Sequence, residues 1–414
     1  MRAFALAEEA ERHLPDDPVL ADIWSAVSVR MSVHTTPEGA DVYLNRPYAD
    51  GDEWTHLGKS PIDSLKLPRT ILRWKFEADG YETAERAGEP FSGSVLVDLQ
   101  PGSLPPGMVR VPESKLYFLL TGFNTRKIFN ARHIDVPQFL SDRHEVTNAA
   151  YLEFVEGDGY RNQDFWEHLT FTLDGEDISW SAAVAHFRDS TGRFGPSTWE
   201  GGRYPDGEAD YPVRGVSWFE AAAYAAFRGR QLPTIYHWSR LSIFPAFEEF
   251  DFDQGESLKV GRFREEMIAS SNFSELGAVA VGSMENVGFF GSYDLAGNVR
   301  EWCWNATNDH SASNRYILGG AWNDPSYLYT YGLAESPWDR SQTNGFRLAD
   351  FAGRNERNKP LLQPVDLPVQ EQIPSISDDV FQVYSELYSY DRKELKAVTE
   401  SVDRSATHWT QETV

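Results

Sequence analysis

The chain has 414 residues, enough for two or three domains, and its formal net charge at pH 7 is −25 because 63 acidic side chains outnumber 38 basic ones. This charge repels phosphate backbones, and no basic face interleaved with aromatic residues compensates for it, so the composition excludes nucleic-acid binding. A single cysteine, Cys303, excludes an internal disulfide framework and a cysteine-rich zinc site.

Residues 1–29 are predicted to form a helical segment. Apolar residues recur on one side of residues 4–14, with acidic residues opposite, and Asp17-Pro18 marks a second helix start. Glu8-Glu9 interrupts the apolar run that a signal peptide needs, and no apolar run approaches the roughly 18 residues of a membrane span. We therefore expect a soluble chain, cytoplasmic by default, or extracytoplasmic if a membrane helix precedes it in a longer parent protein.

Residues 30–100 have the alternation of short strands. Residues 32–34 and 40–44 alternate between apolar and polar side chains, and Thr36-Pro37-Glu38-Gly39 between them is a turn signal. This part resembles a PEGA domain, which takes its name from the tetrapeptide that stands here at residues 37–40. The resemblance implies a small β-sandwich that serves as an accessory attachment module. A linker rich in Pro and Gly follows at residues 101–106.

Residues 107–352 are predicted to form the largest domain, organised around residues 292–304. Asp294 and Glu301 supply hard oxygen atoms, and the turn at Gly297-Asn298 can expose carbonyls between them, a combination that suits Ca²⁺. Trp302 and Trp304 alternate around Cys303 as one face of a buried strand does. Spacing alone also fits a tight turn that enters a buried strand, with both carboxylates solvated.

A set of motifs in this domain resembles the formylglycine-generating enzyme family, also called sulfatase-modifying factor domains. The motifs follow the family's order and lie at residues 107–112, 142–151, 212–224, 232–238, 297–302, 319–322 and 345–347. The resemblance implies an α+β fold related to C-type lectins, with little regular secondary structure and long ordered loops. Helices are predicted at residues 146–155 and 219–228, with Ser217 near the second N-cap. Residues 160–212 match the family poorly, and we interpret them as an inserted surface loop.

The chemistry of the family depends on copper. Formylglycine-generating enzymes oxidise a substrate cysteine with O₂, using copper held by two thiolates, which are the ligands that Cu(I) prefers. Aligned with the family, the two cysteine positions fall on Leu328 and Leu333, and no cysteine follows Trp304. We therefore expect no copper, and we interpret Cys303 as a small buried residue.

The resemblance also implies a structural Ca²⁺ site. Its ligands would be the side chains of Asp294 and Glu301 and the carbonyls of Gly297 and Val299. Family enzymes hold an extended peptide in a groove, and the corresponding segment of this chain is rich in aromatic residues. The candidates for lining a ligand-binding groove are Trp322, Tyr327, Tyr329, Tyr331 and Trp338.

Residues 353–414 are predicted to contain a polar linker, a helix at residues 378–390 and a final strand without a partner. The order of PEGA domain, formylglycine-enzyme-like domain and tail resembles the middle region of large bacterial proteins with a Ser/Thr kinase upstream and an α/β-hydrolase downstream. We therefore expect the chain to be a piece of such a protein. It has no kinase nucleotide loop and no nucleophile elbow of its own.

Two hypotheses of function follow. The first is a non-catalytic family member, a protein- or ligand-binding regulatory region of a multidomain signalling protein with a protein or peptide partner. The alternative is an oxidoreductase of the sulfatase-modifying factor family that acts on a cysteine or sulfur substrate through an unrecognised site, for which Cys303 is the only thiol. The oligomeric state is left open.

Overall fold

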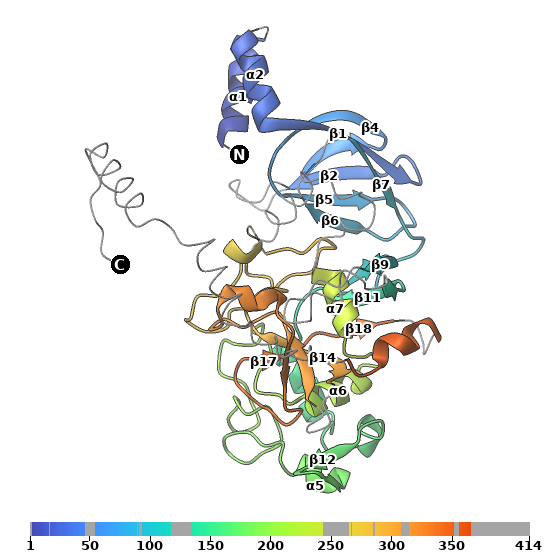
Figure 1. Ribbon diagram of the computed structural model, residues 1–414, viewed down its shortest axis with the longest axis vertical. Helices are drawn as coiled ribbons and strands as arrows, with labels where there is room; N and C mark the ends of the chain where they lie inside the picture. The colour runs from blue at the N-terminus through green and yellow to red at the C-terminus, as the bar shows by residue number, and fades with distance from the viewer. Residues whose placement is uncertain are drawn as a thin grey trace, which may run out of the picture. The chain divides into compact units, whose positions relative to one another are not determined.

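The computed structural model describes residues 2–15, 17–45, 54–88, 90, 93–116, 134–242, 265, 267–284, 286–307, 314–351 and 356–365 (Figure 1). All of them belong to the first of two compact units, Met1–Pro368. The second unit, Val369–Val414, lies outside the described residues, as do the helix predicted at residues 378–390 and the final strand. Within the described part of the chain, every helix is too short or too polar to cross a membrane.

Two helices open the chain, α1 (Arg2–His13) and α2 (Pro18–Val27). The carboxylate of Asp17 caps α2 by accepting hydrogen bonds from the backbone N–H groups of Val19 at 2.8 Å and Leu20 at 3.3 Å. Phe4 of α1 packs edge-on against Trp24 of α2, with 5.1 Å between the ring centroids. The two helices fall within the range for which a helical segment is predicted.

Two sheets follow, and they share one apolar cluster. The first has the order β4-β1-β7, and the second has the order β3-β2-β5-β6. Their strands are β1 (Ser28–Thr36), β2 (Asp41–Asn45), β3 (Thr55–Lys59), β4 (Ile62–Pro68), β5 (Leu72–Glu77), β6 (Ala84–Gly88) and β7 (Gly93–Asp98). Alternate side chains of β1, β2 and β5 are buried in the shared cluster, among them Val33, Val42 and Leu72.

The rest of the unit mixes short strands, short helices and long loops, which confirms the predicted mixture of helix and sheet. Its sheets have the orders β10-β9, β18-β11-β8, β12-β13 and β16-β15-β14-β17. The strands are β8 (Met108–Val111), β9 (Ser114–Leu116), β10 (Ile134–Val136), β11 (Phe139–Asp142), β12 (Phe171–Leu173), β13 (Glu176–Ile178), β14 (Arg300–Ala306), β15 (Arg315–Leu318), β16 (Leu333–Glu335), β17 (Asn344–Gly345) and β18 (Ala349–Asp350). The helices are α4 (Asn148–Glu156), η1 (Gln163–Phe165), α5 (Trp180–Val184), α6 (Trp218–Phe227), α7 (Ile235–Ser242), η3 (Ser326–Thr330) and η4 (Glu356–Leu362).

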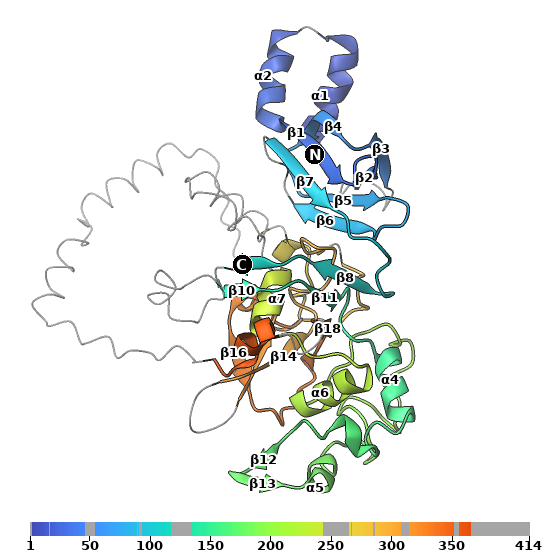
Figure 2. The same ribbon diagram turned by 90° about the vertical axis from the view of Figure 1, so that its right-hand side faces the viewer.

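Strand β14 separates two apolar clusters. Trp302 is buried in one cluster, with residues of α6, and Cys303 is buried in the other, with residues of α7. The neighbouring strand β15 divides in the same way, since Ile317 joins the first cluster while Tyr316 and Leu318 join the second. Figures 1 and 2 both show α6 and α7 on opposite sides of β14. The predicted buried strand around Cys303 is confirmed.

Two local predictions need correction. The helix expected at residues 146–155 begins at Asn148, because the side chain of Thr147 accepts a hydrogen bond from the N–H of Ala150 and caps it there, which leaves Val146 outside. The interpretation of residues 160–212 as a surface loop is wrong for much of the segment. This segment contains η1, the β12-β13 hairpin and α5, and it buries large side chains such as Trp166 and Trp199 in the cluster of Trp302.

Candidate functional site

The predicted ligand Glu301 lies in a closed ion pair at the start of β14. Arg347 donates from Nη2 to Oε1 at 2.6 Å and from Nε to Oε2 at 2.7 Å, and both side chains are 0% exposed. The indole Nε1 of Trp238 also donates to Oε2, at 2.9 Å. Protein donors therefore occupy both carboxylate oxygens, in the two-pronged geometry that suits arginine and carboxylate.

Two further carboxylates are buried beside this pair. Glu145 accepts hydrogen bonds from Nδ2 of Asn298 at 2.7 Å and from the N–H of Val299 at 3.2 Å. Burial raises the pKa of Glu145 well above its usual range, and the charges of Asp294 and Glu301 raise it further. Three buried acids thus lie near the guanidinium of Arg347, and Glu301 is the one that it pairs with.

Asp294 is the acid of this group with an unsatisfied oxygen. Its Oδ2 accepts a hydrogen bond from the N–H of Gly282 at 2.6 Å, whereas its Oδ1 has no hydrogen-bond partner among the described residues. Burial raises the pKa of the Asp294 carboxyl from 3.8 to about 6.

The four predicted calcium ligands lie in one loop and the strand that it enters. Gly297 has a φ of +76°, and a Cβ there would collide with the carbonyl oxygen of Asn272, so only glycine fits. Val299 is fully buried. Across the part of the chain that the structure describes, His, Cys, Asp and Glu side chains form no group of three suited to a metal ion. Arg347 and Trp238 already donate to both oxygens of Glu301, whereas Oδ1 of Asp294 has no hydrogen-bond partner among the described residues. Ca²⁺ binding stays a prediction.

The thiol of Cys303 is closed to solvent. Its side chain is 0% exposed, and burial together with the charge of Glu301 raises the pKa of the thiol well above its ordinary value. Leu328 in η3 and Leu333 in β16 are half-buried apolar residues. A raised pKa and a buried sulfur both disfavour the thiolate that binds metals or attacks a substrate.

The five predicted groove residues do not share one surface. Tyr329 is 2% exposed and belongs to the cluster of Cys303, and its hydroxyl donates to the carbonyl of Ser242 at 2.8 Å. Trp338 packs on Phe219 of the other cluster, with 4.7 Å between ring centroids. Trp322 is half-buried, while Tyr327 and Tyr331 are 63% and 39% exposed. Tyr327 and Tyr331 are the most exposed of the five, and the groove itself stays a prediction.

A second buried ion pair was missed by sequence reasoning. Arg340 donates from Nε to Oε2 of Glu220 at 2.8 Å and from Nη2 to Oε1 at 3.0 Å. The hydroxyl of Tyr160 donates to the same carboxylate at 2.7 Å. Glu220 also completes a capping box with Ser217 at the start of α6. The Ser-x-x-Glu spacing was the available signal for Glu220, but nothing local marks its partner 120 residues away.

Comparison with known proteins gives one family model and several relatives. The model of the sulfatase-modifying factor enzyme 1-like domain matches residues 95–352. Over 256 residues the chain is 27% identical to the inactive C-alpha-formylglycine-generating enzyme 2 of Mus musculus, covering 54% of this chain and 79% of that protein. It is 33% identical over 176 residues to hercynine oxygenase of Mycolicibacterium thermoresistibile, covering 37% of this chain and 34% of that protein. It is 24% identical over 254 residues to the serine/threonine-protein kinase Pkn1 of Chlamydia trachomatis, covering 55% of this chain and 36% of that protein.

Proposed function

The chain belongs to the sulfatase-modifying factor enzyme 1-like domain family, and on this premise we propose that it is a non-catalytic member that binds a protein, a peptide or another ligand. The observation that carries the proposal is the state of the only thiol, since Cys303 is fully buried and has no second cysteine to share a metal with. Copper oxidation of the kind that the family resemblance implies needs two thiolates.

The relatives support the proposal of a non-catalytic member, and they also support a role for it in a regulatory protein. One relative is named as an inactive enzyme, and another as a serine/threonine-protein kinase. We accordingly propose that the domain serves a multidomain signalling protein. The assignment of residues 30–100 as a PEGA β-sandwich belongs to the same proposal, and its support is the apolar cluster that the two N-terminal sheets share.

The test is an oxidation assay. The purified chain is incubated in air with Cu(I), a reductant and a cysteine-containing peptide, and the mass of the peptide is followed, with an active family oxidase in parallel. We expect an unchanged peptide and no copper retained by the chain after dialysis. Conversion of the cysteine to formylglycine would contradict the proposal.

A second candidate function is an oxidoreductase that acts on a sulfur substrate through Cys303. The similarity to hercynine oxygenase favours it, although the similar stretch spans 34% of that protein. Labelling with a thiol reagent separates the two functions, because a side chain that is 0% exposed should react only after unfolding in guanidinium. Rapid labelling of the folded chain, together with loss of any activity in Cys303→Ala, would favour the oxidoreductase.

A further inference from the structure

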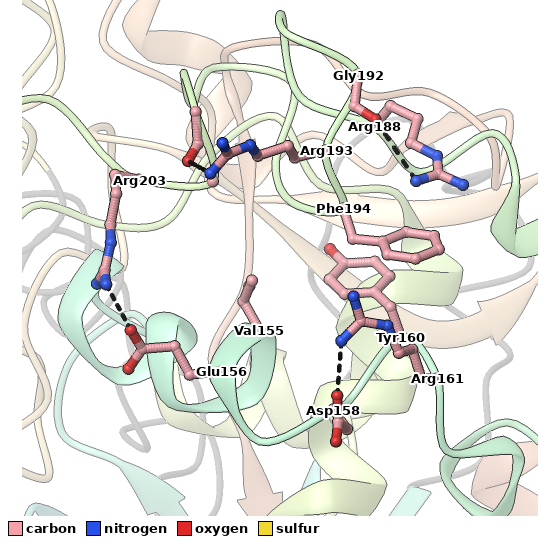
Figure 3. Close-up of a pocket in the computed structure, with 12 residues that line it drawn as sticks. Val155, Glu156, Asp158, Tyr160, Arg161, Arg188, Gly192, Arg193, Phe194 and Arg203 are labelled. Atoms are coloured by element: carbon pink, nitrogen blue, oxygen red, sulfur yellow. Dashed lines mark hydrogen bonds and ion pairs between the residues drawn. The ribbon is translucent and has the colours of Figure 1, made fainter.

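Four arginines line a cavity of about 520 Å³ beside the C-terminal end of α4. We call it the arginine pocket, defined by Arg161, Arg188, Arg193 and Arg203. Figure 3 shows Arg188, Phe194 and Arg161 on one side of the pocket and Arg203 with Glu156 on the other. The lining also contains the carboxylates of Glu156 and Asp158, so cations outnumber anions in a chain whose net charge is −25.

The side chain of Asp189 holds one wall of the pocket in place. Its Oδ1 accepts hydrogen bonds from the N–H groups of Thr191 at 2.8 Å and Arg193 at 2.9 Å, and its Oδ2 accepts one from the N–H of Gly202 at 2.6 Å. The guanidinium of Arg193 then donates to the carbonyl of Gly201 at 2.9 Å. The two loop segments that carry this wall are therefore tied to each other.

The buried ion pair of Arg340 and Glu220 anchors the other wall. Arg340 donates from Nη1 to the carbonyl of Arg188 at 2.7 Å and from Nη2 to the carbonyl of Gly195 at 2.6 Å. Between these two points, Phe194 stacks on Tyr160 with 5.4 Å between ring centroids and 9° between planes. The loop is thus fixed on a buried network before any ligand arrives, which lowers the entropic cost of binding.

The arginine side chains are held weakly enough to meet a ligand. The guanidinium of Arg188 lies 3.7 Å over the ring of Phe194, and its hydrogen bonds to the carbonyls of Ala185 and Gly192 are long, at 3.4 and 3.5 Å. Arg161 pairs with Asp158 at 2.8 Å and Arg203 with Glu156 at 2.7 Å, and every side chain of these two pairs is more than half exposed. Exposed pairs of this kind contribute little, so an entering anion displaces them easily.

We propose that the arginine pocket binds a small molecule through an oxyanion, either a phosphate monoester or a carboxylate. Guanidinium groups donate in a planar fork that matches both groups. The cavity also has the volume of small-molecule sites, which is roughly 300–1,000 Å³. The inference goes beyond the proposed non-catalytic function and stands apart from it, because none of the pocket residues belongs to the predicted copper, calcium or groove positions.

The test is calorimetric titration of the full chain at low ionic strength with phenyl phosphate, with citrate and, as a neutral control, with phenol. We expect saturable binding of at least one anion and none of phenol. Arg161→Gln and Arg203→Gln should each raise Kd about tenfold, as expected for a lost hydrogen bond to a charged group. Arg357→Gln is the matched control, because Arg357 forms an equally exposed pair with Glu113 at 3.1 Å outside the pocket.

The titrations distinguish phosphate esters from carboxylates as ligands, and they also define the results that would overturn the inference. Binding of phenyl phosphate alone assigns the pocket to phosphate esters, and binding of citrate alone assigns it to carboxylates. Wild type that binds neither anion overturns the inference. So does equal weakening by Arg357→Gln, or an unchanged Kd in both Arg161→Gln and Arg203→Gln with melting temperatures that show folded protein. None of these results depends on copper oxidation. The proposal of an anion-binding pocket and the proposal of a non-catalytic family member can therefore fail independently.

Discussion

Replacing Asp294 by Asn should stabilise the protein at neutral pH, by an amount that shrinks as the pH falls. Burial raises the pKa of Asp294 from 3.8 to about 6. A carboxyl with a raised pKa in the folded state contributes stability below its unfolded pKa, and that stability is lost as the pH rises through about 6. Asn keeps an oxygen for the N–H of Gly282 and carries no charge.

The size of the effect follows from the two pKa values. Their separation corresponds to roughly 3 kcal/mol in total, of which about 2 kcal/mol falls between pH 4.5 and pH 7.5. The difference in free energy of unfolding between Asp294→Asn and wild type should therefore shift in favour of the variant by about 2 kcal/mol over this range. A new amide hydrogen without a partner would subtract about 1 kcal/mol at both values of pH, and the shift would remain.

Urea unfolding followed by tryptophan fluorescence measures this shift, with a calcium chelator present throughout. Asp63→Asn is the control, because Asp63 is 79% exposed and its replacement should change the free energy of unfolding by less than about 0.5 kcal/mol. A difference between Asp294→Asn and wild type that stays constant from pH 4.5 to pH 7.5 would refute the reasoning, since it would mean that Asp294 is not a buried acid with a raised pKa.

The remaining predictions concern the same domain. Arg347→Met should lower the free energy of unfolding by about 3–5 kcal/mol, because it leaves the buried charge of Glu301 uncompensated; a loss below about 1 kcal/mol in urea unfolding would contradict the closed ion pair. If Ca²⁺ binds at Asp294 and Glu301, saturation at ~100 times Kd should add roughly 2.7 kcal/mol, and wild-type melting curves that coincide in calcium and in chelator would remove the site. Ser217→Ala should cost about 1 kcal/mol through loss of the capping box at α6, and an unchanged urea midpoint would show that the cap does not matter for stability.

Local elements of the fold could be predicted where the residues that encode them are close neighbours in the sequence. The Ser217 cap of α6 and the buried strand around Cys303 are both encoded within a few residues. The cap at Thr147 is hidden in the sequence because Val146 continues the apolar spacing of the helix. In the structure, the N–H of Val146 donates to the carbonyl of Phe346 and its carbonyl accepts from the N–H of Val213, so Val146 lies outside the helix.

The long-range partners could not be predicted in the same way. Glu301 looks like a free oxygen donor in the sequence, since Arg347 stands 46 residues further along and no spacing rule joins them. The aromatic residues within 160–212 look like loop contacts because their core partners, such as Phe219, lie outside the segment. Burial of a side chain by distant residues leaves no periodic trace in a segment rich in Gly and Asp.

Residues 160–199 pack on only one of the two apolar clusters that β14 separates. Every core residue contributed by residues 160–199 enters the cluster of Trp302, and none enters the cluster of Cys303. Substitutions that repack the core side chains of this segment should therefore disturb the cluster of Trp302 before the cluster that contains Cys303 and Trp238. The same segment contributes Arg161, Arg188 and Arg193 to the arginine pocket, whereas Glu301 and Arg347 lie outside it, so a substitution in the segment can alter the pocket without replacing either residue of that ion pair.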